Sequence, residues 1–222
     1  MNPFRHVITK PWEKKGVIGG LRHRGAFDTP PARVGLVFFL FVATVLFFLF
    51  SVAYNVRMTL PDWQPLAAPG QLWLNTGLLV VSSALFQWAR NIVRRDITQD
   101  VQPHAQAAQA QLAQAHPRNL MMAFVGAGLF AFLFIAGQLM VWDGLYGAGY
   151  SMASNPANSF FYLLTGVHGA HLLGGLWVWS KSLIRLLSGG EVKDVRLSIE
   201  LCTLYWHFLL VVWLVMFALL AN

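Results

Sequence analysis

Five long apolar blocks constrain the fold of this chain more than any other feature. Each block is long enough, at a rise of about 1.5 Å per residue, to cross a hydrocarbon layer of about 30 Å. The chain is 56% hydrophobic and only 11% charged, whereas about a quarter of the residues in a soluble domain are charged. The sequence therefore predicts an all-α integral membrane bundle. Its five transmembrane helices are expected over residues 34–54, 72–89, 120–142, 158–184 and 197–220.

The positions of the basic residues predict how this bundle lies in the membrane. Short cytoplasmic connections are enriched in Lys and Arg, and of the 16 Lys and Arg residues only Arg57 lies on the other side. We expect residues 1–33 to form a basic cytoplasmic segment, residues 34–222 to form the transmembrane domain, and the C-terminus to lie outside. A bacterial cytoplasmic membrane, with the periplasm outside, fits this orientation. The net charge of +7 favours anionic lipid as a neighbour and not nucleic acid, because the charges form no surface interleaved with aromatic residues.

One connection has a biased composition. Gln and Ala dominate the segment between Pro103 and Pro117, and both residue types are good helix formers. The sequence predicts a short cytoplasmic helix near 104–115. Because its apolar positions are nearly all Ala, this helix is expected to lie against protein and not to insert into lipid.

Polar side chains inside the apolar blocks are the candidates for function, because ionisable residues are rare and costly within a membrane. They are His168, His171, Glu200, His207 and the uncharged Gln138. At about 100° per residue, His168 and His171 lie on one side of the fourth block, and His207 lies at a similar depth on the fifth. We expect these residues to form an interhelical polar cluster, in which Glu200 pairs with Arg196 or with water near the cytoplasmic surface. A proton relay through Glu200 is the alternative.

Two interpretations of the histidines remain open. In the first, neutral imidazoles form hydrogen bonds between helices, each worth about 0.6 kcal/mol on average, and His207 bonds to a polar group on the third or fourth block. In the second, the chain is a small bis-His membrane cytochrome or a metal carrier, in which His207 and either His168 or His171 hold the metal. The sequence has no paired thiolates, carboxylate cluster or HExxH motif. We therefore expect no metal, no cofactor and no catalytic residue in this chain.

Two further sets of residues are expected to make contacts. Gly166, Ala170 and Gly174 recur every four residues and predict a small-residue stripe against which another helix packs closely. Lipid contacts are expected at aromatic and basic residues of the second and fifth blocks, namely Trp88, Arg90, Arg196, Trp206 and Trp213.

Four segments resemble those of one known family. The segment "FFYLLTGVHGAHLLGG", residues 160–175, resembles the most characteristic part of subunit III of the haem-copper terminal oxidases, such as cytochrome c oxidase. "IELCTLYWHFLLVVWLVMFALL" from Ile199 resembles the family's final helix, while "WLNTGLLVVSSALFQWA" from Trp73 and "RVGLVFFLF" from Arg33 resemble two other helices. Five helices with the N-terminus inside are similar to the short bacterial form, which lacks the first two helices of the seven-helix form.

The resemblance implies a function and a set of partners. A chain of this kind would be non-catalytic, and would belong to an enzyme only as part of a respiratory oxidase that reduces oxygen and pumps protons with haem and copper held in subunits I and II. It would stabilise the catalytic subunit, bind phospholipid, support proton uptake and protect the complex during turnover. Further small subunits or a supercomplex are additional partners. A homologue attached to a nitric-oxide reductase is an alternative that differs only in its partner.

Two positions depart from the family pattern. The family usually carries a membrane-buried carboxylate in the helix that begins at Arg33, where this chain has Ala43 and Thr44. It also usually has an Asp at the position of Leu210. These differences favour assembly, lipid binding and protection over a direct role in proton handling.

Overall fold

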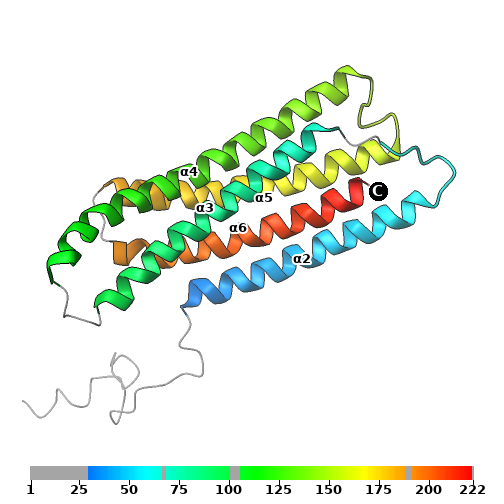
Figure 1. Ribbon diagram of the computed structural model, residues 1–222. Coiled ribbons are helices and arrows are strands. Elements are labelled where there is room, and N and C mark those ends of the chain that lie inside the picture. The colour runs from blue at the N-terminus through cyan, green and yellow to red at the C-terminus, as the bar shows by residue number, and fades with distance from the viewer. Residues whose placement is uncertain (1–29, 67–68, 101–105, 189–191, 222) are drawn as a thin grey trace, which may run out of the picture. The chain divides into compact units, whose positions relative to one another are not determined.

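The computed structural model describes residues 30–66, 69–100, 106–188 and 192–221, and all regular secondary structure within them is helical. Within them the chain forms five helices (Figure 1). The helices are α2 (Pro31–Met58), α3 (Gln71–Asp100), α4 (Gln106–Gly147), α5 (Pro156–Leu187) and α6 (Val192–Leu220). The predicted all-α architecture is confirmed.

The chain divides into two compact units after Gly35. Of the first, residues 1–35, the structure describes only the opening turn of α2, where the Pro30 carbonyl accepts hydrogen bonds from the amides of Arg33 and Val34. Proline suits the start of a helix because the first amides of a helix have no partner within it. The rest of the predicted basic segment lies outside the described residues. The second unit, residues 36–222, contains the remainder of α2 and the helices α3–α6.

Four of the five helices are long and apolar enough to cross a membrane. The four candidate spans are Pro31–Met58, Gln71–Arg94, Arg118–Gly147 and Val195–Leu220. The fifth helix, α5, has 32 residues and is less apolar because it contains two histidines and several glycines. Since α5 packs directly between α4 and α6, we interpret it as the remaining span of the bundle.

The helices α3, α4, α5 and α6 form a ring in which each helix packs against two neighbours. The backbone of α3 approaches those of α4 and α6, and the backbone of α5 approaches the same two helices. Large aromatic side chains fill the space between these four helices, and Trp206 and Trp213 are both fully buried. The part of α2 in this unit stands further away and reaches the ring through aromatic side chains, as Phe39 does with Tyr205 at 6.1 Å between ring centroids.

The helix predicted near 104–115 does not end before the third span. Residues up to 105 of that segment lie outside the described residues, and from Gln106 the helix continues without a break to Gly147 as the 42-residue α4. Pro117 lies inside it. A proline removes one amide donor from a helix and disfavours the helical conformation before it, but it does not end this one. Residues 106–115 are therefore helical as predicted, but as the first part of α4 and not as a short helix of their own.

Local capping sets where α5 begins. Asn155 has an extended backbone, and its side-chain oxygen accepts a hydrogen bond from the Ala157 amide at 3.1 Å. Pro156 follows at the first helical position, where its missing amide costs nothing. The Asn155 side chain also donates to the Gln64 carbonyl at 2.6 Å, so the same residue fastens the α2–α3 connection to the start of α5.

Candidate functional site

His168 on α5 is fully buried and surrounded by aromatic rings. The ring centroids of Phe47, Phe134 and Trp213 lie 6.4, 5.9 and 5.3 Å from the imidazole centroid. Neither ring nitrogen has a hydrogen-bond partner among the described residues. His168 therefore joins α2, α4 and α6 by packing alone, without the interhelical hydrogen bond that the sequence predicts.

His171 makes its hydrogen bond within its own helix. Its Nδ1 lies 2.8 Å from the carbonyl oxygen of Val167, one turn earlier. The rings of Phe39 and Phe47 on α2 pack against the imidazole at 5.9 and 5.4 Å between centroids. The Tyr205 hydroxyl of α6 donates to the His171 carbonyl at 2.8 Å. His171 therefore contacts α2 through its imidazole ring and α6 through its backbone carbonyl.

His207 on α6 forms the interhelical hydrogen bonds that the sequence predicts, but with a different helix. Its Nδ1 lies 2.5 Å from the Ser83 hydroxyl, and its Nε2 lies 3.1 Å from the Gln87 side-chain oxygen. Both partners belong to α3, so the prediction of a partner on the third or fourth span is wrong. Periodicity along α6 places His207 on one face, but it does not specify which neighbouring helix that face meets.

Glu200 lies near the N-terminal end of α6 and pairs with two arginines. The Arg196 Nε lies 3.3 Å from the Glu200 Oε1, as expected one turn away, and the Arg94 Nε lies 3.9 Å from the same atom. Arg94 belongs to α3, and nothing in the sequence pattern identifies it as a partner. All three side chains are partly exposed, so we expect the pairing to contribute little to stability.

Two buried amides also lack partners. All four side-chain polar atoms of Asn75 on α3 and Gln138 on α4 are buried without a hydrogen bond among the described residues. A Cβ atom at Gly137 would lie 2.3 Å from the Asn75 side-chain oxygen. Glycine at this position thus lets α3 and α4 meet around the Asn75 amide. The predicted cluster residue Gln138 is next to Gly137 in the sequence, and the hydrogen bonds of His171, Glu200 and His207 among the described residues are made with other residues.

The arrangement does not match a bis-His haem site. Both ring nitrogens of His207 are engaged by side chains of α3, and the His168 imidazole is enclosed by carbon rings. Among the residues that the structure describes, no three His, Cys, Asp or Glu side chains are grouped so that they could hold a metal ion.

Comparison with known proteins decides the family. The family model described as cytochrome c oxidase subunit III matches residues 22–221, a range that includes all of the helices described above. The chain belongs to the cytochrome c oxidase subunit III family.

Individual members of the subunit III family match the chain with modest identity. The cytochrome c oxidase subunit 3 of Synechocystis sp. is 27% identical over 190 residues, which are 83% of this chain and 72% of that protein. The protein of the same name from Marchantia polymorpha is 29% identical over 197 residues, which are 83% of this chain and 66% of that protein. A probable cytochrome c oxidase subunit 3 of Nocardia farcinica is 35% identical over 85 residues, or 38% and 42% of the two chains. The chain thus spans only part of the length of each of these relatives.

The small-residue stripe predicted on α5 of this subunit III chain is mostly exposed. A Cβ at Gly166 would meet the Trp142 ring at 3.3 Å, but nothing lies within 4 Å of Gly174, and Ala170 is exposed. The close approach occurs one residue later, at Gly175, where a Cβ would lie 2.7 Å from the rings of Trp206 and Tyr205. Within this chain the close approach therefore falls on Gly175 and not on Gly174, because one residue step turns the helix by about 100°. Packing of Ala170 and Gly174 against a helix of another chain stays a prediction.

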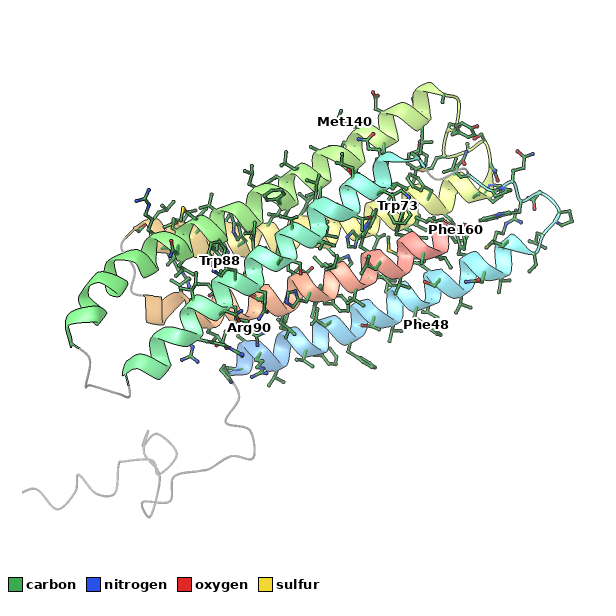
Figure 2. All side chains as sticks on the ribbon, in the orientation of Figure 1. Phe48, Trp73, Trp88, Arg90, Met140 and Phe160 are labelled. Atoms are coloured by element: carbon green, nitrogen blue, oxygen red, sulfur yellow. The ribbon has the colours of Figure 1, made fainter. Side chains whose placement is uncertain are left out.

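Two of the predicted lipid contacts are excluded by burial. The side chains of Trp206 and Trp213 are fully buried among the helices, so they cannot touch lipid. Trp88 on α3 remains 47% exposed, and Arg90 and Arg196 are both partly exposed. Figure 2 shows Trp88 and Arg90 on the same stretch of α3.

The two α2 residues that depart from the subunit III pattern, Ala43 and Thr44, differ in their surroundings. Ala43 is buried one turn from both Phe39 and Phe47, the two residues whose rings cover the α5 histidines. Thr44 is exposed and donates to the Leu40 carbonyl of its own helix. A carboxylate at position 43 would therefore lie on the face of α2 that meets these histidines, whereas alanine leaves aromatic carbon against them.

Proposed function

We propose that this chain is a non-catalytic subunit of a membrane-bound haem-copper oxidase, in which it stabilises the catalytic subunit and protects it during turnover. The observation that supports this most strongly is the family match, which extends over the whole helical bundle from residue 22 to residue 221. The geometry agrees with it, because the intramembrane histidines contact helices of the chain and do not converge on a common centre. Haem and copper would belong to the partner subunits, and subunits I and II are the partners that the resemblance implies.

The residues of this chain bear differently on two parts of the proposed role, which are proton handling and phospholipid binding. Proton handling through a carboxylate beside the α5 histidines has no group to carry it, because Ala43 occupies that position. Support of proton uptake would therefore act through the structure of the complex. Phospholipid is the proposed neighbour of Trp88 and Arg196, whose side chains are exposed toward the cytoplasmic end of the bundle.

Purification of the intact complex tests the proposal. A tagged form of this chain, isolated from its own bacterial membranes in mild detergent, is expected to bring with it haem-bearing subunits, an absorbance spectrum of reduced haem and oxygen consumption. Removal of the chain is expected to leave initial oxygen consumption largely intact and to shorten the period over which it persists. Isolation of the polypeptide alone, or with a complex that reduces nitric oxide and not oxygen, would contradict the proposal.

A further inference from the structure

Two amide side chains at the contact between α3 and α4 have no hydrogen bond. Asn75 on α3 is fully buried and Gln138 on α4 is 8% exposed. Each amide offers a nitrogen with two N–H donors and an oxygen that accepts, and none of these four atoms has a partner among the described residues. A polar atom that is buried without a hydrogen bond destabilises the folded state, and the cost is larger in apolar surroundings. The two amides therefore require a partner that the described side chains do not supply.

Both amides belong to the close approach of α3 and α4 at Gly137. A Cβ atom at Gly137 would lie 2.3 Å from the Asn75 side-chain oxygen and 3.2 Å from its nitrogen, so the Asn75 amide occupies the space that a side chain at Gly137 would fill. Gln138 is the next residue, and its Cα is therefore about 3.8 Å from that of Gly137. Gln71, one turn before Asn75, donates to the Gly137 carbonyl at 3.3 Å. Three amide side chains are thus grouped around one glycine of α4.

Burial restricts what this partner can be. All four atoms lie inside the chain, out of reach of a lipid headgroup or of a helix from another protein. A metal ion is a poor occupant, because Ca²⁺ and Mg²⁺ take about six or more oxygen ligands, whereas Asn75 and Gln138 offer two neutral oxygens. Water fits, because an internal water molecule makes about two to four hydrogen bonds and can both donate and accept. The two amides present both kinds of group.

Water has a short route to Asn75. Gln71 is the first residue of α3 and is partly exposed, and Asn75 lies about 6 Å further along the helix axis. Asn75 is therefore near the end of α3 that adjoins the α2–α3 connection, where a membrane-spanning helix meets the aqueous phase. A water molecule can enter past Gln71 without crossing the hydrocarbon layer. Internal waters in proteins typically satisfy buried polar groups that protein atoms leave unpaired.

His168 is also buried without a hydrogen bond among the described residues, but it does not offer water the same surroundings. Its ring neighbours are Phe47, Phe134 and Trp213, and the Trp213 indole already donates to the Thr76 hydroxyl at 2.9 Å. A water molecule among these rings would have the imidazole as its one polar partner, and apolar cavities stay dry. The water site is therefore restricted to the two amides.

We propose that Asn75 and Gln138 together bind an internal water molecule between α3 and α4. The water accepts a hydrogen bond from the nitrogen of one amide and donates to the oxygen of the other. It thereby joins the two helices at the place where Gly137 leaves room for the Asn75 amide. The inference concerns a contact within this chain, so it is independent of the function proposed above.

Transfer of magnetisation from water to side-chain amides, measured by solid-state NMR, tests for the water molecule. The full chain, labelled with ¹⁵N and purified with the subunits that accompany it, is studied in lipid bilayers. We expect transfer from water to the side-chain nitrogens of both Asn75 and Gln138. The control is the buried Trp179 indole, which donates to the Phe124 carbonyl at 2.9 Å and should receive none. Absence of transfer to either amide, or equal transfer to Trp179, would overturn the proposal.

Removal of one amide tests whether the water forms a bridge. Gln138→Leu keeps the approximate size of the side chain but removes both polar atoms, so we expect the transfer to Asn75 to disappear. The matched control is Ser82→Ala, which removes a different α3–α4 hydrogen bond, from the Ser82 hydroxyl to the Ala127 carbonyl at 2.7 Å, and should leave the transfer to Asn75 unchanged. Undiminished transfer to Asn75 in Gln138→Leu would overturn the bridge. The helix content of each variant, measured by circular dichroism, verifies folding, and the wild-type measurement does not depend on the variants.

Discussion

At the scale of single residues, His168 and His207 show that two imidazoles in one bundle can have opposite energetic roles. His168 is fully buried, with both nitrogens unpartnered among aromatic rings. His207 has a partner at each nitrogen. A buried polar group without a hydrogen bond costs free energy. When a polar side chain that does have partners is replaced, those partners lose their hydrogen bonds.

Substitution by phenylalanine should separate the two histidines. We expect His168→Phe to leave the free energy of unfolding unchanged or to raise it by up to about 2 kcal/mol, because phenylalanine fills the aromatic site without unpartnered nitrogens. His207→Phe should lower it by about 1–2 kcal/mol, because Ser83 and Gln87 lose their partner. Reversible unfolding in mixed detergent micelles measures both. A larger loss for His168→Phe than for His207→Phe would mean that His168 has a polar partner.

At the scale of helices, adjacent glycines on α5 test how closely the helices approach. A Cβ at Gly175 would lie 2.7 Å from the rings of Trp206 and Tyr205, whereas one at Gly174 would meet nothing within 4 Å. Trp206 is fully buried, so its ring cannot move away from such a Cβ without displacing its neighbours. We expect Gly175→Ala to destabilise the chain by about 1–3 kcal/mol through overpacking, and Gly174→Ala, its control, to have no such effect. Equal unfolding free energies for the two variants would contradict this packing.

The ion pair at the end of α2 predicts a pH dependence. The Arg57 guanidinium donates to both carboxylate oxygens of Asp62, and this holds the pKa of Asp62 below its usual value of 3.8. A carboxyl whose pKa is lower in the folded state stabilises that state above the unfolded pKa, and the effect disappears as the pH falls through the folded pKa. The pair is therefore fully effective above about pH 4.

Hydrogen exchange at the adjoining turn measures this effect. The amides of Thr59 and Leu60 donate to the carbonyls of Val56 and Arg57. We expect their protection to be greater in the wild type than in Asp62→Asn above pH 4 and the difference to vanish at lower pH. Because both side chains of the pair are on the surface, the difference should be small. A difference that grows as the pH falls would show that the ion pair is not its cause.

At the scale of the whole molecule, the bundle predicts which connections share one side of the membrane. Because α5 crosses the membrane between them, the loop between α4 and α5 and the turn after α5 should lie on opposite sides. Cys202, the single cysteine, is buried, so introduced cysteines report without background. We expect Ala153→Cys, at an exposed position of the outer loop, to react with an impermeant thiol reagent in intact cells, and Ser188→Cys to react only after the membrane is opened. The reverse pattern would mean that the orientation derived from the basic residues is wrong.

The amino-acid sequence by itself determined that five helices form, in which order, and that they belong in a membrane, whereas α3 and α4 extend beyond their predicted limits. An apolar run of sufficient length leaves the backbone no alternative to internal hydrogen bonds, so a helix across the membrane follows from composition and length alone. The segments around His168, Asn75 and His207 also identified the family without reference to any contact.

Only the tertiary structure decided which residues meet. In a membrane the lipid is as apolar as the interior of the bundle, so hydrophobic periodicity does not specify the rotation of a helix about its axis. Each residue turns the helix by about 100°, and for that reason Gly175 and not Gly174 contacts α6, Trp206 and Trp213 face the core and not lipid, and His207 bonds to Ser83 and Gln87 on α3. These outcomes depend on shape complementarity among side chains that lie far apart in the sequence, and no local pattern contains it.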